Sequence, residues 1–586
     1  MFFLNVMNVR ERNKERLLDV LNCLIIFIVC FLMLRGTFHD GFPRDHLDAT
    51  MAYYIAKVKM LLDKFEFYTA SWYFGYELLR FYPPLSTLLP YVVAIVSGNL
   101  NFSYYILCFI FYTLFCLGIY AFLQRFINSK IAGLTGGVLW AVTHVNVISF
   151  QGHYWETTRL FGTAAVPWVL YFADRAITRG ERRDILTTIF LTAYSFLSSM
   201  LSVFDLIIVL FPFILIRGFV FVPESPDFLD QIRSNSIRSL KIGIAGILGL
   251  CCWWYIPAML PFGVKPFFSG HSSYPPEIFQ VLFQWNPPGW MPAVQIPITL
   301  LGLFGVSLAI YKKDRKGLLL VVWLLLAILT AYMIKLQPVR LILNIGFSII
   351  LLAGYSFSCL IELFHRIIDE RITWNQRHIE TAVYIISIII ISSIVSMYLP
   401  RYSNYVNVDN SYKSTDEYLT ATWLKDNVNK SYFVYVMYGN SFRGAQWLNT
   451  FYPEVQQVLG GFDQGAHATG NSRSFEFDNI IKGSLNSTET YQQCREYHVK
   501  YVVVDKTGLL GSAPLAYEKF EDSTYFRQVD NIRPELTYAY VFEVLDVDPL
   551  DIKDVDYQYW NYWRVVGFFS SLSFLGLFLL NIFPRN

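Results

Sequence analysis

Apolar runs long enough to cross a lipid bilayer recur along this chain of 586 residues, and they limit its fold more than any other feature. Hydrophobic residues make up 54% of the chain and charged residues only 16%, with a mean hydropathy of +0.38. These values exclude an ordinary soluble globular protein, and the net charge of +2 gives no indication of nucleic-acid binding. We therefore predict a polytopic α-helical membrane protein that contacts membrane lipid and no nucleic acid.

The charges of the loops predict how the apolar runs are oriented. Residues 83–98 form a short run that opens with Pro83-Pro84, as helices at a membrane interface do. If this run does not cross, the basic N-terminus and every basic loop fall on one side, which the positive-inside rule identifies as cytoplasmic. We therefore expect an interfacial or re-entrant helix at 83–98, both termini in the cytoplasm, and about twelve transmembrane helices. The expected spans are 18–36, 102–123, 131–150, 160–177, 186–203, 204–222, 242–261, 295–311, 317–335, 340–363, 381–399 and 560–582.

A change in composition after residue 400 predicts a second domain on the outer face. Short apolar runs predict buried strands at 430–439, 499–505 and 538–547, and TDEYLTATWLKDNV (415–428) predicts a helix capped by Thr415. We therefore expect a small extracytoplasmic α/β domain. The chain divides into a transmembrane module at 1–399, this domain at 400–559, and the last span with a cytoplasmic tail at 560–586.

The first outward loop, residues 37–101, opens with a dense cluster of acids in FHDGFPRDHLDATMAY (38–53). Asp40 follows the first span, and Asp45 and Asp48 fall on the first turn of an amphipathic helix that periodicity predicts at 45–63, on the membrane surface. Solvated acids at a helix start would explain each residue alone. Three together at an outer surface favour catalytic carboxylates.

Other polar residues gather in the later outward loops. GHYWETTRL (152–160) holds His153, Glu156 and Arg159 close to the hydrocarbon, where an unpaired charge is costly, and an ion pair between Glu156 and Arg159 is the alternative reading. Arg340 lies at the outer mouth of a span, suited either to gripping a phosphate or to snorkelling. The further candidates for substrate binding are Arg80, Tyr82, Lys265 and His271.

One chemistry agrees with these residues. Outward acids would activate an acceptor hydroxyl, basic side chains would hold the phosphate of a lipid-linked leaving group, and a groove between spans would receive the lipid tail. No nucleotide sugar is normally available outside a cell, so a lipid-phosphate donor is the one expected. No metal-ligand spacing is found among the eight cysteines, and we expect no cofactor and no metal.

Several stretches resemble a known superfamily. RDHLDATMAYY (44–54) and WYFGYELLRFYPPLSTLLPY (72–91) resemble the GT-C superfamily of membrane glycosyltransferases and, more narrowly, the membrane proteins labelled "6-pyruvoyl-tetrahydropterin synthase-related". QPVRLILNIGFSIILLAGYSF (337–357) and VLGGFDQGAHA (458–468) look like the corresponding stretches of that group. The resemblance covers most of the chain, although its motifs are short.

The resemblance implies a GT-C-type inverting glycosyltransferase that transfers a sugar from a polyprenyl-phosphate carrier to a glycan, lipid or protein acceptor on the outer face. It implies Asp48 as the catalytic carboxylate, with Asp45 and Asp40 as alternatives, Glu156 as an assisting acid, and Arg340 at the donor phosphate. The Trp-Trp-Asp-Tyr-Gly motif of oligosaccharyltransferases is absent, because WWYIP (253–257) lacks the acid. This departure argues against en-bloc transfer of a glycan to Asn.

Two other functions remain open at this point. A transporter or flippase of a lipid-linked substrate would place polar residues at mid-span, where Asp205 is the main candidate. A non-catalytic scaffold would instead use the domain at 400–559 to bind a partner.

Overall fold

The protein is described by a computed structural model, and the account below covers the following residues: 2–38, 41–43, 49–63, 65, 68–69, 72, 76–79, 82–143, 157–220, 226–259, 278–283, 294–333, 338–371, 376–403, 408–409, 411–437, 448, 451–459, 472–483, 486–505, 518–532, 534–537, 539–550 and 560–582.

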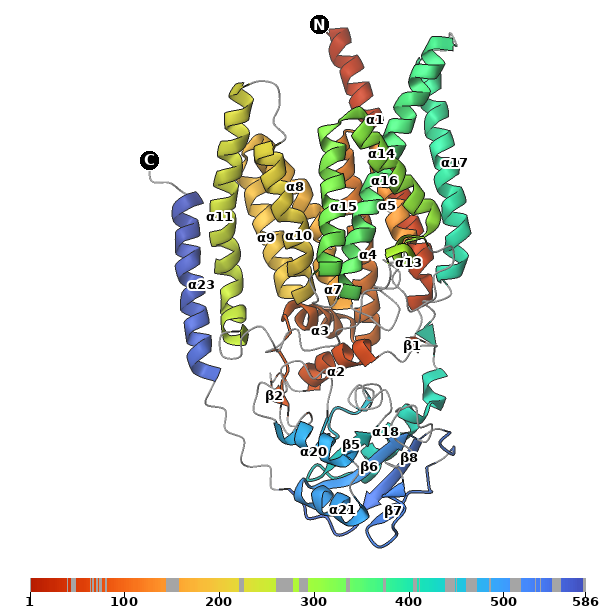
Figure 1. Ribbon diagram of the computed structural model, residues 1–586, viewed down its shortest axis with the longest axis vertical. Helices are drawn as coiled ribbons and strands as arrows, with labels where there is room; N and C mark the ends of the chain where they lie inside the picture. The colour runs from red at the N-terminus through yellow and green to blue at the C-terminus, as the bar shows by residue number, and fades with distance from the viewer. Residues whose placement is uncertain are drawn as a thin grey trace.

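Long apolar helices run side by side in a bundle, with a small sheet-containing domain at one end (Figure 1). Among the described residues, six helical segments are long and apolar enough to cross a membrane, and further apolar helices are shorter. The expected number of twelve spans is therefore not confirmed and stays a prediction. The helices of the bundle are α1 (Phe2–Leu34), α4 (Leu100–Ile127), α5 (Lys130–Val142), α7 (Thr157–Thr163), α8 (Val166–Arg179), α9 (Arg182–Ser198), α10 (Met200–Leu215), α11 (Pro226–Met259), α14 (Ile296–Lys312), α15 (Arg315–Met333), α16 (Pro338–Arg371), α17 (Gln376–Ser403) and α23 (Trp560–Ile582).

Some predicted span boundaries are wrong. The predicted spans 186–203 and 204–222 meet four residues too late, because α9 and α10 are separated at Ser199, whose backbone is extended (φ −156°, ψ 135°). Both helices are apolar on either side of this residue, so hydropathy alone gives no signal for the break. The predicted span 242–261 is only the second half of α11, which begins in a polar stretch at Pro226.

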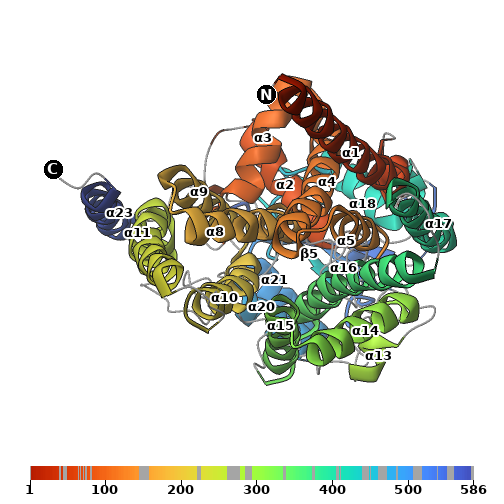
Figure 2. The same cartoon turned by 90° about the horizontal axis from the view of Figure 1, so that it is seen from above.

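Close helix contacts hold the bundle together at small residues. A Cβ atom on Gly305 of α14 would lie 2.3 Å from the carbonyl oxygen of Leu352 in α16, so only glycine fits there. At the edge of the bundle, Gly249 of α11 meets Leu575 of α23 in the same way. Seen from above, α11 and α23 lie together at one side, far from α1 and α17 (Figure 2).

Two short helices lie where the bundle meets the domain (Figure 1): α2 (Ala49–Asp63) and α3 (Leu85–Ser97). α3 lies at the end of the bundle next to the domain (Figure 1), and its expected place at a membrane interface stays a prediction. The expected amphipathic helix at 45–63 is found as α2 in its described part, and its place on a membrane surface stays a prediction. Residues 54–58 of α2 are all buried, because α2 is covered by the bundle on one side and by the domain on the other.

The domain is built on a four-stranded sheet of order β5-β6-β8-β7. Alternate residues of each strand point to opposite faces, so the sheet has two cores. Val434, Val436 and Val503 pack with α18, and Tyr435 and Val502 pack with α20 and α21. The strands are β5 (Phe433–Met437), β6 (Val499–Asp505), β7 (Phe526–Gln528) and β8 (Ala539–Val544), and the helices are α18 (Asp416–Asn427), α20 (Ser472–Lys482) and α21 (Ser487–Glu496).

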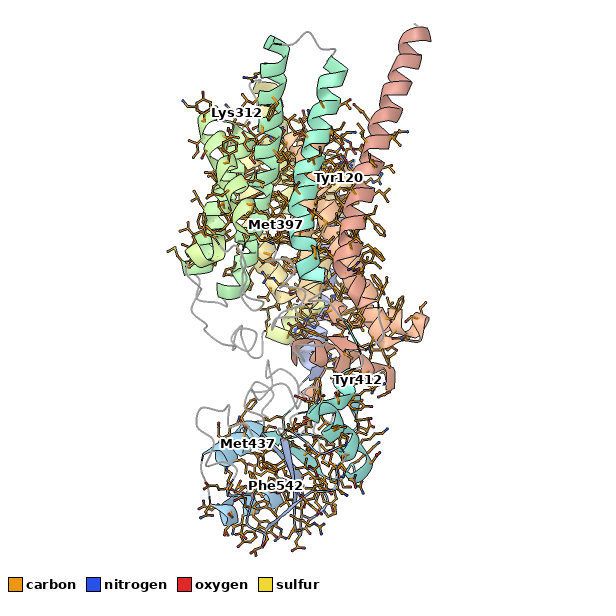
Figure 3. All side chains as sticks on the ribbon, turned by 90° about the vertical axis from the view of Figure 1, so that its right-hand side faces the viewer. Tyr120, Lys312, Met397, Tyr412, Met437 and Phe542 are labelled. Carbon is orange, nitrogen blue, oxygen red and sulfur yellow. The ribbon has the colours of Figure 1, made fainter. Side chains whose placement is uncertain are left out.

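The sequence-based prediction of these domain elements is confirmed. Three of the four strands and α18 lie within the predicted segments, and the hydroxyl of Thr415 caps α18 by accepting a hydrogen bond from the backbone N–H of Tyr418 (3.4 Å). The domain lies at one end of the molecule, where Met437 and Phe542 are found, whereas Lys312 of a basic loop lies at the opposite end (Figure 3). Both chain termini also lie toward that opposite end (Figure 1).

Candidate functional site

Most of the predicted site residues lie outside the described part of the chain. Tyr82 and Arg159 are described with their side chains, whereas Arg340 is described only as a member of α16. The site is therefore described from the residues that lie next to these candidates in the sequence. The predicted residues outside the described part are Asp40, Asp45, Asp48, Arg80, His153, Glu156, Lys265 and His271.

Residues 41–43, which lie between Asp40 and Asp45, make several contacts with the rest of the protein. The backbone carbonyl of Gly41 accepts hydrogen bonds from the hydroxyl of Tyr105 (3.0 Å) and the side-chain amide of Asn101 (3.5 Å), both on α4. Strand β1 (Phe42–Pro43) then pairs in antiparallel fashion with β4 (Val408–Asp409), which leads into the domain. The segment directly after Asp40 and before Asp45 is thus fixed at the junction of bundle and domain.

A buried ionic cluster lies at the same end of the bundle. Arg159 of α7 donates two hydrogen bonds to the carboxylate of Asp205 on α10, from Nη2 to Oδ1 (2.8 Å) and from Nε to Oδ2 (3.2 Å). The amide of Asn344 on α16 donates a further bond to Oδ1 (2.8 Å). All three residues are at most 4% exposed, so each charge is compensated inside the protein.

This cluster brings together elements that are far apart in sequence. Arg159 directly follows the loop that carries His153 and Glu156, and Arg340 lies one helical turn before Asn344 in α16. The predicted Arg159 belongs to this cluster, where its described partner is Asp205, and its predicted part in substrate binding stays a prediction. The sequence had singled out Asp205 as a coupling residue for a transporter, and it gave no indication of Asn344, a single polar residue in a very apolar span.

Tyr82, which lies three residues before α3, contacts α2. Its ring meets that of Tyr54 of α2 edge to face, with 5.2 Å between centroids, and Nζ of Lys57 lies 5.1 Å from its centroid. Lys57 is fully buried, and this desolvation holds the pKa of its amine well below its ordinary value. Tyr82 therefore has a packing role at the base of the first outward loop.

An apolar cavity of 310 Å³ lies between α8, α9, α10 and α11. It begins beside the ionic cluster, because Leu206 and Ile207, the two residues after Asp205, line it. Ile207, Phe211 and Ile244 of its lining are 54%, 51% and 53% exposed, so the cavity opens sideways toward the lipid. We name it the lateral groove.

Metal binding is not decided by the geometry. Among the residues with described side chains, no three His, Cys, Asp or Glu groups are close enough to hold a metal ion. The acids of the first two outward loops lie outside that set, so the expectation of a metal-independent site stays a prediction.

Solved structures with the same fold are membrane glycosyltransferases. The oligosaccharyltransferase of Archaeoglobus fulgidus in its apo form matches with a TM-score of 0.55 and 13% identity, over 91% of this chain and 75% of that one. The arabinofuranosyltransferase AftD from mycobacteria matches with 0.53 and 13%, over 93% and 42%. ArnT from Cupriavidus metallidurans in its apo state matches with 0.51 and 12%, over 89% and 97%. The chain is therefore a polytopic membrane protein with the GT-C fold.

A comparison of the sequence with family models also found a match. A family model described as "Family of unknown function (DUF6541)" matches residues 79–425, and the chain belongs to that family. No curated protein matches the sequence. The narrower resemblance to the "6-pyruvoyl-tetrahydropterin synthase-related" group is not shown by these comparisons.

Proposed function

We propose that this protein is an inverting membrane glycosyltransferase that takes a sugar from a polyprenyl-phosphate donor at the end of the bundle that faces the α/β domain. The observation that carries the proposal is the buried Arg159–Asp205–Asn344 cluster, which joins the second outward loop to the start of α16 within a GT-C fold. Arg340 lies one helical turn before Asn344, and Glu156 lies three residues before Arg159 in the sequence, which supports a shared role for both at this end of the bundle.

The proposed reaction needs a base, an acceptor and a leaving group. A carboxylate of the first outward loop, Asp48 in the first place and Asp45 or Asp40 as alternatives, removes the proton of the acceptor hydroxyl. The hydroxyl oxygen then bonds to the anomeric carbon as the bond from that carbon to the phosphate oxygen breaks. The polyprenyl phosphate leaves with the electron pair, and the anomeric configuration is inverted.

The leaving phosphate requires a cationic site. Arg340, in the first turn of α16, is the proposed ligand, since guanidinium groups bind phosphate in a bidentate fork. α10 and α16 both begin at this end, and the positive ends of their dipoles favour an anion. Arg159 is already neutralised by Asp205, so we assign it a positioning role, holding the loop of Glu156 against α16.

The lateral groove is the proposed site of the lipid tail. It begins next to Asp205, it is lined by side chains that are almost all apolar, and it opens toward the lipid, as a long isoprenoid chain requires. The archaeal oligosaccharyltransferase with the same fold has been solved with a dolichol-phosphate. This supports a lipid of that class as the donor, with the sugar and acceptor left to experiment.

The same arrangement supports an orientation in the membrane. We propose that both termini and the basic loops lie in the cytoplasm, and that the acidic loop and the α/β domain lie outside the cell. The paired state of Asp205 does not favour the transporter alternative, since a carboxylate that is paired with Arg159 and also accepts a hydrogen bond from Asn344 has no free coupling charge.

Chemical conversion of the donor distinguishes the enzyme from the alternatives. Purified protein in liposomes receives a labelled polyprenyl-phosphate sugar and an acceptor mixture extracted from membranes. A glycosyltransferase releases free polyprenyl phosphate in step with labelled acceptor. A flippase moves the labelled lipid between leaflets unchanged, and a scaffold does neither, so either outcome would refute the proposal.

A further inference from the structure

The α/β domain touches the first outward loop on both sides of the acids at 44–48. On the N-terminal side, Phe42 pairs with Asp409 and Pro43 with Val408 in the β1–β4 ladder. On the C-terminal side, the chain enters α2, and Nζ of Lys59 in that helix donates a hydrogen bond to the backbone carbonyl of Phe451 in the domain. The chain therefore contacts the domain both before residue 44 and after residue 48.

The two attachments belong to one packed unit of the domain. Tyr412 lies in the turn directly after β4, and its ring stacks on that of Phe451, with 5.5 Å between centroids and 13° between planes. Tyr418 of α18 meets Phe451 edge to face at 4.9 Å. Because the same aromatic cluster supports both attachments, a shift of the domain would move both ends of the acidic loop together.

The Lys59 contact is partly shielded from water. Nζ lies 5.8 Å from the ring centroid of Tyr452, and Lys425 of α18 approaches that ring to 4.7 Å. Burial is the largest influence on Lys59 and lowers the pKa of its amine. A hydrogen bond from an amine in such a setting is stronger than one in water.

We propose that the α/β domain is the positioning element of the acidic loop, with Lys59 as a positioning residue and the β1–β4 ladder as its second anchor. This inference rests on the proposed function, because it assigns the acids of that loop to the chemistry. If the domain positions the loop, the domain stays in contact with the loop throughout the reaction. Small displacements of a catalytic group are costly, since about 1 Å lowers the rate by about 100-fold.

Variants of Lys59 test the first anchor. Lys59→Met keeps the length of the side chain but removes the donor, and should lower kcat about 10- to 100-fold with an unchanged KM for the donor. It should also speed tryptic cleavage after Arg44, a readout that needs no activity. Lys59→Arg should restore both. Lys425→Met is the matched control, because Lys425 also approaches the Tyr452 ring and its removal leaves the hydrogen bond from Lys59 to Phe451 intact.

A cross-link tests the second anchor. The double variant Phe42→Cys/Asp409→Cys places thiols at directly paired positions, close enough for a disulfide. The native cysteines are buried or half-buried and should not interfere. We expect the disulfide to form and to leave the transfer rate close to that of the uncross-linked protein. A cross-linked protein that is inactive until reduced, or a Lys59→Met variant with the wild-type kcat and cleavage rate, would overturn the proposal.

The failure of this inference can be told apart from failure of the proposed function. If the wild-type protein transfers no sugar, the proposed function fails. The cleavage and cross-linking results still decide whether the domain holds the loop.

Discussion

The carboxylate of Asp205 accepts hydrogen bonds from both arms of Arg159 and from Asn344 in a region that is closed to water. Removing one partner of such a pair leaves a buried charge without compensation, which costs about 3–5 kcal/mol. Asp205→Ala should therefore lower the melting temperature of the purified protein strongly. The double variant Arg159→Met/Asp205→Leu removes both charges and should recover most of the stability.

The same double variant separates stability from function. We expect it to fold but to lose transfer activity, because the loop of Glu156 loses its attachment to α16. If it folds and transfers sugar at the wild-type rate, the cluster only stabilises the bundle, and its assignment to the site is wrong.

Lys519 provides a pH-dependent measurement in the α/β domain. It is 5% exposed, its Nζ donates to the carbonyl of Ile481, and burial lowers its pKa to about 8 from 10.5. The folded state therefore disfavours the charged amine, so its stability penalty is complete below about pH 8 and disappears as the pH rises toward 10.5. Lys519→Met should be more stable than the wild type at neutral pH.

The stability gap between the two proteins should narrow as the pH rises from neutral to about 10. Thermal unfolding of the full-length protein, followed by circular dichroism over this range, measures the gap. A gap that stays constant would show that the amine is not destabilised by burial.

The contacts between individual side chains were the feature of this protein that the sequence predicted least well. Arg159 stood out in the sequence because a charge beside the hydrocarbon needs a partner. Its partner Asp205 lies 46 residues further along, on another helix, and no local pattern connects them. The burial of Lys57 had no signal in the sequence, since a lysine on a helix is usually exposed and its burial here depends on tertiary contacts such as that with Tyr82.

At the scale of elements, the domain strands and α18 were predicted because their signals are local: alternating or continuous apolar runs and a Thr cap. The ends of helices within the bundle were not predicted. The turn at Ser199 lies between two apolar helices, and α7 and α8 are separated at Ala164–Ala165 within one apolar run. Tertiary packing sets these breaks, so the sequence gives no periodicity that ends there.

The lateral groove can be blocked at one position without straining the backbone. Gly243 of α11 lines the groove, and a Cβ atom there meets nothing within 4 Å. Gly243→Phe should fill the groove and raise the KM for the polyprenyl-phosphate donor about tenfold or more, in line with loss of one buried hydrophobic contact. Gly576→Phe in α23 is the matched control, because that site is equally open but lies outside the groove lining.

Equal donor KM values for the wild type and both glycine variants would show that the lipid tail does not bind in this groove. The readout is independent of the ionic cluster, so it tests the groove separately from the phosphate site.

At the scale of the whole molecule, the sequence predicted the two-part architecture because hydropathy and composition are averaged over long stretches. The predicted orientation rests on the positive-inside rule, and the structure places the basic loop of Lys312 at the end opposite to the domain (Figure 3). What the sequence did not indicate is the close docking of the domain onto α2, which depends on contacts between residues such as Lys59 and Phe451.

Cysteine labelling of intact cells tests this orientation. Asn427 is an exposed residue of the domain, and Lys313 is an exposed residue of a basic loop at the other end. Asn427→Cys should react with an impermeant maleimide in intact cells, whereas Lys313→Cys should react only after the membrane is opened. Reversed labelling would place the acidic loop in the cytoplasm and contradict the proposed use of a lipid-linked donor outside the cell.

The transfer rates of single Asp→Asn variants show whether a carboxylate of the first outward loop activates the acceptor. Release of polyprenyl phosphate and formation of glycosylated acceptor are measured for Asp40→Asn, Asp45→Asn and Asp48→Asn beside the wild type. Loss of the general base should lower the rate about 100- to 10,000-fold, and we expect this for Asp48→Asn. Wild-type transfer rates in all three variants would contradict the account.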